Sequence, residues 1–119
     1  VHIILEGVAS ENVSTVFNGR KSSETNKAGV LWPQHNAYLT VRNVKFSKTD
    51  GKGNSPAIRV ASGGEALTLE NCVFDGNKTG GNAASVAVYT AAKVLIKGCT
   101  FINNAGTGSA LFVNNSARS

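Results

Sequence analysis

The strongest constraint on the fold is an internal repeat of 27–28 residues. Three eight-residue units read LTVRNVKF, LTLENCVF and VLIKGCTF, and they begin at Leu39, Leu67 and Val94. A short apolar run follows each unit: AIRV, SVAV and ALFV. A fainter first copy reads IILEGV and ends, after a longer polar loop, in GVLW. A fixed period of this length is typical of chains that stack one supersecondary unit on the next.

Each repeat alternates apolar and polar residues and then changes phase at one turn residue. Leu67 and Leu69 alternate with polar neighbours, as in a strand with one buried face. The alternation stops at Asn71 and resumes on the other phase with Cys72 and Phe74. Gly or Asn occupies the turn position in every copy, and both residues tolerate the left-handed conformation at low cost. We therefore expect left-handed turns at Gly7, Asn43, Asn71 and Gly98.

Strands this short bury an inward face only when coils stack and share one core. The sequence thus predicts an all-β fold, a right-handed parallel β-helix (β-solenoid) of four coils with three short strands per coil. The general rule for parallel crossovers supports the handedness. One domain spans residues 1–119, with coils near 1–33, 34–61, 62–89 and 90–119. Its interior should hold four ladders: Ile3, Leu39, Leu67 and Val94; Val8, Val44, Cys72 and Cys99; Phe46, Phe74 and Phe101; and Trp32, Val60 and Val88.

Composition agrees with this fold and excludes others. The chain has 13 glycines, two prolines and no methionine, so turn formers dominate and a helical bundle is excluded. No apolar run approaches the ~18 residues of a membrane-spanning helix, and we expect no membrane insertion. We expect Cys72 and Cys99 to be stacked free thiols, because in-register neighbours rarely meet the torsion of a disulfide. No Cys/His grouping suggests a metal, and no cofactor is expected.

The repeat unit resembles those of known β-helix proteins. The pattern Leu-x-Leu-x-Asn-x-x-Phe, found at residues 67–74, is similar to the right-handed parallel β-helix proteins of the pectate-lyase-like superfamily, across nearly the whole chain. FDGN at residues 74–77, and FINN at 101–104 followed by GSAL at 108–111, resemble the repeats of chlamydial polymorphic membrane proteins and related bacterial surface adhesins. The resemblance implies a right-handed β-helix at the cell surface.

An enzyme is the main alternative, because lyases that share this fold resemble one another in using clustered acids beside an Arg or Lys base. Glycoside hydrolysis needs two carboxylates about 5–9.5 Å apart. The repeat brings no two of the seven acidic residues together, and Asp50 and Asp75 fall on different coils. We therefore predict no enzymatic activity, no catalytic residue and no metal ligand. The alternative is a carbohydrate-binding or polysaccharide-degrading β-helix protein, with sugars stacked on the outward-facing Tyr38, Tyr89 and Phe112.

The formal net charge of +5 favours acidic partners. Basic residues gather in the loops after the second strand of the first two coils, where they form either a solvated loop face or a patch for an anionic polysaccharide or nucleic acid. This predicted patch comprises Arg20, Lys21, Lys27, Lys45, Lys48 and Lys52. Three matches to the glycosylation sequon also fall in predicted loops, at Asn12, Asn77 and Asn114.

Charges alternate along one outward column, Glu6, Arg42, Glu70 and Lys97, which fixes the register of adjacent coils. Neither terminal coil has a predicted cap, although solenoids ordinarily need one. We therefore predict a non-enzymatic structural module of the cell surface or extracellular space, whose partner is itself. Copies stack head to tail into a fibre, or tandem copies form part of a long adhesin. The expected interface is Ile3, Leu5, Glu6, Val8, Val94, Ile96, Lys97 and Cys99.

Overall fold

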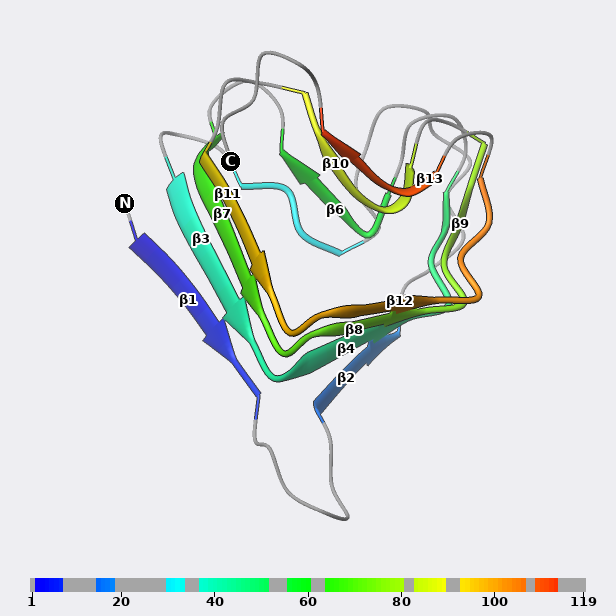
Figure 1. The fold of residues 1–119 in the computed structure, drawn as a ribbon, viewed down its shortest axis with the longest axis horizontal. Coiled ribbons are helices and arrows are strands. Elements are labelled where there is room, and N and C mark those ends of the chain that lie inside the picture. The colour runs from blue at the N-terminus through cyan, green and yellow to red at the C-terminus, as the bar shows by residue number, and fades with distance from the viewer. Residues whose placement is uncertain are drawn as a thin grey trace.

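The structure is a computed structural model, which describes residues 2–7, 15–18, 30–33, 37–51, 56–60, 64–80, 83–89, 93–106 and 109–113. Within these ranges the regular elements are thirteen β-strands. Figure 1 shows the strands winding around a shared interior, and every strand pair is parallel. The all-β parallel architecture predicted from the repeat is confirmed.

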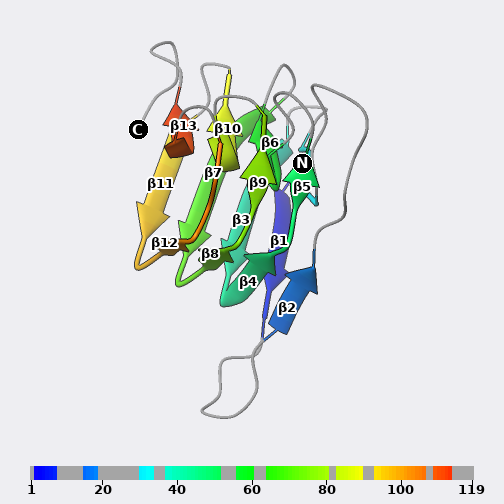
Figure 2. The same cartoon turned by 90° about the vertical axis from the view of Figure 1, so that its right-hand side faces the viewer.

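Two four-stranded parallel sheets form two walls of the winding. The first wall has the order β1 (His2–Glu6), β3 (Ala37–Arg42), β7 (Gly64–Glu70) and β11 (Lys93–Lys97). The second wall contains β2 (Thr15–Asn18), β4 (Val44–Ser47), β8 (Val73–Asp75) and β12 (Thr100–Ile102). Figure 2 shows these strands stacked along one axis, with β1 and β2 at one end and β11 and β12 at the other.

The third wall is a sheet of β6 (Ile58–Val60), β10 (Ala83–Val88) and β13 (Ser109–Val113). In the described part of the first coil, a single bridge from Leu31 to Ile58 stands in place of a strand. A fourth, two-stranded sheet of β5 (Asp50–Gly51) and β9 (Lys78–Thr79) was not expected. The prediction of three strands per coil is therefore incomplete, because the two middle coils carry an extra two-residue strand.

The turns between the first and second walls have the predicted conformation at three positions. Asn43 and Asn71 have φ angles of 56° and 53°, and Gly98 has 64°. Backbone hydrogen bonds continue between coils through these turns: the Asn43 N–H donates to Glu70 O at 3.1 Å and the Asn71 N–H to Lys97 O at 2.9 Å. A Cβ at Gly98 would also displace the end of the Asn71 side chain.

The first coil departs from the repeat between its first two strands. β1 ends at Glu6 and β2 begins at Thr15, whereas a single residue separates β3 from β4. β2 pairs with β4 so that Thr15 lies opposite Val44. The prediction that Val8 belongs to this ladder is wrong, because Thr15 holds the position, and Val8 itself lies outside the described residues. Gly7 is not among the described residues with positive φ, since the chain does not turn directly into β2.

Two of the predicted ladders are confirmed. The aromatic rings of Phe46, Phe74 and Phe101 stack with centroid separations of 5.0 and 4.9 Å and interplanar angles of 9° and 7°. The aliphatic ladder of the first wall is also in register. The buried core includes Leu39, Val41, Val44, Phe46, Ile58, Val60, Leu67, Leu69, Cys72, Phe74, Val86, Val88 and Val94.

The ladder predicted for the third wall is shifted by one residue in the first coil. Leu31 bridges Ile58, which in turn lies opposite Val86. Trp32 consequently lies beside Arg59, whose guanidinium carbon is 5.2 Å from the indole centroid. The prediction that placed Trp32 in the ladder of Val60 and Val88 is wrong, because the bridge puts Leu31 opposite Ile58 and so aligns Trp32 with Arg59.

Candidate assembly surfaces

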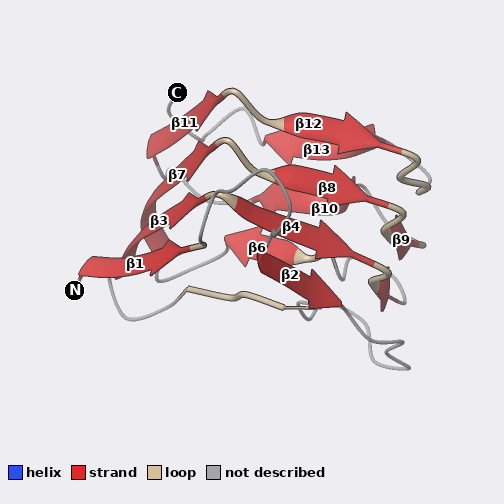
Figure 3. Cartoon of the chain, turned by 90° about the horizontal axis from the view of Figure 1, so that it is seen from below, coloured by secondary structure: helices blue, strands red, loops and turns tan. Residues whose placement is uncertain are grey.

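Six of the eight expected assembly residues lie on β1 and β11, the edge strands at the two ends of the first wall (Figure 3). Strand β1 forms one edge of this sheet and strand β11 forms the other. Within the described part of the chain, no strand pairs with the outer side of either edge strand. The end residues are Ile3, Leu5 and Glu6 on β1, and Val94, Ile96 and Lys97 on β11.

Inward side chains at these ends are less buried than their equivalents in the middle. Leu39 and Leu67 are 3% and 0% exposed, whereas Ile3, which lies opposite Leu39, is 44% exposed. At the other end Val94 is 8% exposed and Ile96 is half-buried. The end coils therefore present apolar surface that the described residues leave accessible to solvent.

The alternating charge column is present on the outer face of the first wall. Arg42 Nη1 lies 4.0 Å from Glu6 Oε2, and Arg42 Nε lies 3.6 Å from Glu70 Oε2. Lys97 lies opposite Glu70 and is exposed, and it has no ion pair with a described residue. The column therefore ends in a carboxylate at β1 and an ammonium group at β11.

Cys72 and Cys99 lie at equivalent positions of adjacent coils, and both thiols are free, as predicted. Cys72 is fully buried, with Sγ 3.4 Å from Val41 O. Cys99 is half-buried and packs against the core from the last described coil. A hydrogen bond from the Cys72 side chain lowers the pKa of Cys99 to about 6. The same bond, together with burial, raises the pKa of Cys72.

The sequon at Asn77 does not lie in an exposed loop. Asn77 is fully buried, and its Oδ1 accepts a hydrogen bond from the Thr49 N–H at 3.1 Å. Its Nδ2 donates to Phe46 O at 3.1 Å and to Ser85 Oγ at 3.3 Å. The prediction of a glycosylation site at Asn77 is wrong for the folded chain, because the nitrogen that would carry the glycan is buried and hydrogen-bonded. The other two predicted sites, Asn12 and Asn114, lie outside the described residues.

Asn104 repeats this arrangement one coil further along. Its Oδ1 accepts the Asn77 N–H at 3.0 Å, and its Nδ2 donates to Phe74 O at 2.8 Å. Thr49 precedes Asn77 in the same stack, and its hydroxyl oxygen is buried with no hydrogen-bond partner. These residues form an asparagine ladder that joins successive coils through side chains. The Phe-x-x-Asn spacing is the sequence feature from which this ladder could have been predicted.

The structure describes only two residues of the predicted basic patch, Lys45 and Lys48, and it places one of them in a strand. Lys45 lies within strand β4 and not in a loop, and its Nζ is 3.4 Å from Asp75 Oδ2. The loop assignment for Lys45 is wrong, because β4 continues to Ser47. Lys48 follows the strand with a φ of 61° and is exposed. The remaining members, Arg20, Lys21, Lys27 and Lys52, lie outside the described residues.

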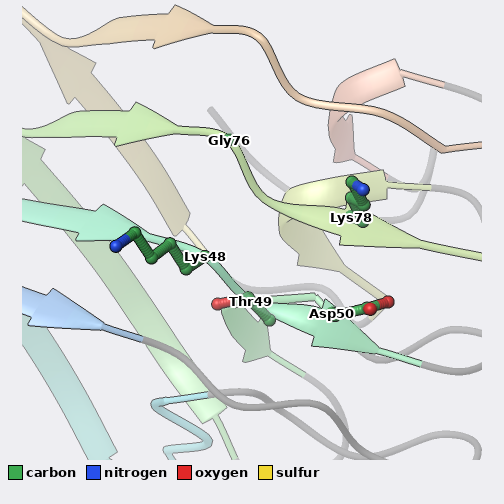
Figure 4. A pocket seen from close by; sticks show the side chains of 5 residues that line it. All are labelled: Lys48, Thr49, Asp50, Gly76 and Lys78. Carbon is green, nitrogen blue, oxygen red and sulfur yellow. The ribbon is translucent and has the colours of Figure 1, made fainter.

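An open depression of about 220 Å³ lies beside Lys48. Thr49, Asp50, Gly76 and Lys78 also line it. Figure 4 shows that the side chains of Lys48 and Lys78 point in different directions and do not converge on one point with Asp50. Within the described residues, no group of three or more His, Cys, Asp or Glu side chains could hold a metal ion. The depression adds Lys78 to the cations on this side, but its side chains do not define a binding site.

Aromatic side chains gather on the outer face of the third wall. The Arg59 guanidinium lies between Trp32 and Tyr89, 5.2 Å from each ring centroid. The rings of Tyr89 and Phe112 are 5.4 Å apart, and both residues are half-buried. Tyr38, on the first wall, is 43% exposed. This outer cluster was not expected as a unit, because its centre is the charged Arg59.

Comparison with known proteins agrees with the architecture. A family model described as a right-handed β-helix region matches residues 6–118. No match was found among curated proteins or among solved structures. In the part of the chain that the structure describes, no helix has the length and apolar character needed to cross a membrane. Because the family match spans nearly the whole chain and coincides with the parallel sheets, the chain belongs to the right-handed β-helix family.

Proposed function

We propose that this chain is a non-enzymatic structural β-solenoid module of the cell surface or extracellular space. It stacks end to end into a fibre, or it forms part of a long adhesin. The observation that carries the proposal is the incomplete burial of inward side chains at both ends of the first wall. Ile3 is 44% exposed at a position where Leu67 is fully buried. Covering such apolar surface with another coil is favourable.

The two end strands are suited to pair with one another. Strand β11 joins β7 in the same parallel register in which β3 joins β1, so β11 of one copy can pair with β1 of the next. This contact uses two different surfaces and therefore propagates without closing. In this register Val94 meets Ile3, Ile96 meets Leu5, and Lys97 meets Glu6.

The described acidic residues support a structural role over a catalytic one. Glu6 and Glu70 flank Arg42, and Asp75 pairs with Lys45, so three carboxylates join neighbouring coils. Carboxylates neutralised in this way stabilise register. They are poorly placed to act together on one sugar bond, because each faces a cation from an adjacent coil.

A charge exchange between the ends tests the proposal. Glu6→Lys places two cations together in the stacked register, and Lys97→Glu places two carboxylates together. Each variant alone should associate a few-fold more weakly at low salt, because exposed pairs contribute only ~0–1 kcal/mol. A mixture of the two variants restores opposite charges at every junction and should recover rods. Sedimentation velocity and electron microscopy measure the association.

Lys78→Glu is the matched control, because Lys78 lies on β9, outside the charge column, and should leave stacking unchanged. Circular dichroism of each variant confirms that its β-structure is retained. A monodisperse monomer at high concentration would contradict the self-stacking form of the proposal. Stacking that is indifferent to both single charge reversals would contradict the proposed register.

Carbohydrate binding is the second candidate function, and the outward aromatic residues favour it. Tyr38 is exposed, and Tyr89 and Phe112 lie together on the third wall. Aromatic faces of this kind suit the apolar faces of sugar rings. A glycan array combined with a reducing-sugar assay separates the two candidates, since a purely structural module should show neither binding nor turnover.

A further inference from the structure

The two cysteines form a pair whose thiol chemistry the proposed function does not use. Strand pairings on both sides of the turn place Cys72 and Cys99 at the same position of adjacent coils. The Thr100 N–H donates to Cys72 O at 2.9 Å, so the two backbones are in direct contact at this point. Cys72 is buried, Cys99 is half-buried, and neither is in a disulfide.

The spacing of adjacent coils decides what such a pair can bind. Neighbouring strands lie about 4.7–4.9 Å apart, and side chains in register inherit this spacing. A disulfide requires the sulfurs to approach to ~2.05 Å with a defined torsion, which in-register neighbours rarely reach. If the bond is similar to the ~2.3 Å zinc–thiolate bond, a metal ion between two opposed thiolates spans ~4.6 Å. The coil spacing therefore fits a sulfur–metal–sulfur unit better than a sulfur–sulfur bond.

We propose that Cys72 and Cys99 bind one soft monovalent metal ion, of the Cu(I) or Ag(I) class, as a two-coordinate thiolate site. Soft thiolate ligands favour ions of this class, whereas zinc requires four ligands and calcium requires an oxygen cage. The described residues provide no group of three or more His, Cys, Asp or Glu side chains. Linear coordination is the geometry that the pair satisfies by itself.

Each thiol releases its proton to solvent as its bond to the metal forms, and no oxidation state changes. The incoming ion bonds to the Cys99 sulfur, which is the more accessible of the two. The Cys72 thiol then loses its proton to solvent as the second metal–sulfur bond forms. The product carries two thiolates and one monovalent cation, a net charge of minus one.

The test uses the reduced full chain, silver(I) as the probe and millimolar glutathione as the competitor. A paired site retains the ion against a monothiol, because its second thiolate acts at a high effective concentration. We expect native mass spectrometry to show one silver ion per chain, and the melting temperature to rise with bound metal. Cys72→Ala and Cys99→Ala should each lose the ion to glutathione. His2→Ala is the matched control and should retain it.

Loss of silver from the unaltered chain under glutathione would overturn the proposal, and so would retention by Cys99→Ala. That variant is decisive because Cys99 is the half-exposed member, and circular dichroism reports whether its fold is kept. Alkylation gives a second measurement on the unaltered chain. Cys99, the more accessible thiol, should react with iodoacetamide in the metal-free chain, and bound silver should protect both cysteines. Unprotected alkylation of Cys99 would contradict the site, whether or not the chain stacks end to end.

Discussion

The middle strands β3 and β7 and the edge strands β1 and β11 carry the same repeat but bury it to different degrees. Inward residues of the middle strands, such as Val41 and Leu69, are 0% exposed. The equivalent Leu5 and Ile96 on the edge strands are only half-buried. The difference shows that burial in this fold depends on position in the stack more than on residue type, because each coil is covered only by the coils on either side.

The same contrast holds for polar groups. Asn77 has neighbours on both sides in the asparagine ladder. Its side chain forms hydrogen bonds with the backbones of Thr49 and Phe46 in the preceding coil, and its backbone N–H donates to Asn104 Oδ1. Asn104 is half-buried and bonds to the preceding coil. Substituting a polar side chain in the middle of the stack therefore breaks more hydrogen bonds than substituting one at its end.

The largest expected difference concerns the phenylalanine stack. Phe74→Ala removes a fully buried ring with an aromatic neighbour on each side and should lower the free energy of unfolding by ~3–5 kcal/mol. Phe101→Ala removes a half-buried ring that stacks on Phe74 alone among the described aromatic residues, and it should cost clearly less. Urea denaturation of both variants measures the difference. Equal losses would contradict the dependence on position in the stack.

The asparagine ladder gives the next largest effect. Asn77→Ala leaves the buried Thr49 N–H without its acceptor and removes the side-chain hydrogen bond to Phe46 O, and an orphaned buried group costs about 1–3 kcal/mol. We expect Asn77→Ala to destabilise the chain by ~2 kcal/mol in urea denaturation, and Asn104→Ala by less. Lys78→Ala, at the exposed neighbouring position, serves as the control. An Asn77→Ala variant as stable as this control would disprove the role of the ladder.

The sequence predicted the interior where repeat and pairing coincide. Between Leu39, Leu67 and Val94 the alternation is regular, and a slip of one residue would expose every apolar side chain, so the register is strongly specified. The first coil lacks this regularity. Its long connection between β1 and β2 leaves open which residue begins the second strand. The consequence was the wrong choice of Val8 over Thr15.

Other features are invisible to periodicity. Strands β5 and β9 have two residues each, too few to show an alternation. Trp32 was misplaced because a single bridge, not a strand, determines its register. Asn77 was interpreted as a loop residue because asparagine is usually exposed. It is buried here because neighbouring backbone groups form hydrogen bonds with its side chain. These contacts depend on the stacking of coils, which residue types alone do not describe.

The asparagine ladder has a threonine, Thr49, in place of an asparagine in the second coil, and a substitution there should stabilise the chain. Thr49 has a buried hydroxyl without a hydrogen-bond partner. Phe17 lies opposite Phe46. The Phe17 carbonyl is therefore placed to accept a hydrogen bond from the side chain of an asparagine at residue 49. Thr49→Asn should raise the free energy of unfolding by ~1 kcal/mol, the typical contribution of one added hydrogen bond. Thr49→Val, which removes the hydroxyl without extending the ladder, is the matched control. A Thr49→Asn variant less stable than Thr49→Val would show that the first coil offers no acceptor.

The smallest expected effect separates the middle and the end of the charge column. Arg42 lies between Glu6 and Glu70 with its side chain 38% exposed, so Arg42→Ala should cost less than ~1 kcal/mol in unfolding free energy. The substitution leaves the two carboxylates about two strand spacings apart, ~9.6 Å. This separation is close to the screening length of ~10 Å at 0.1 M salt. The loss should therefore be measurable by thermal melting at low salt and vanish at high salt.

Lys97→Ala, at the unpaired end, should leave the melting temperature of the unassociated chain unchanged and weaken only its stacking. A loss at Arg42 that persists in high salt would show that its aliphatic stem stabilises the sheet by packing, so that the alternation of charge sets register without adding stability.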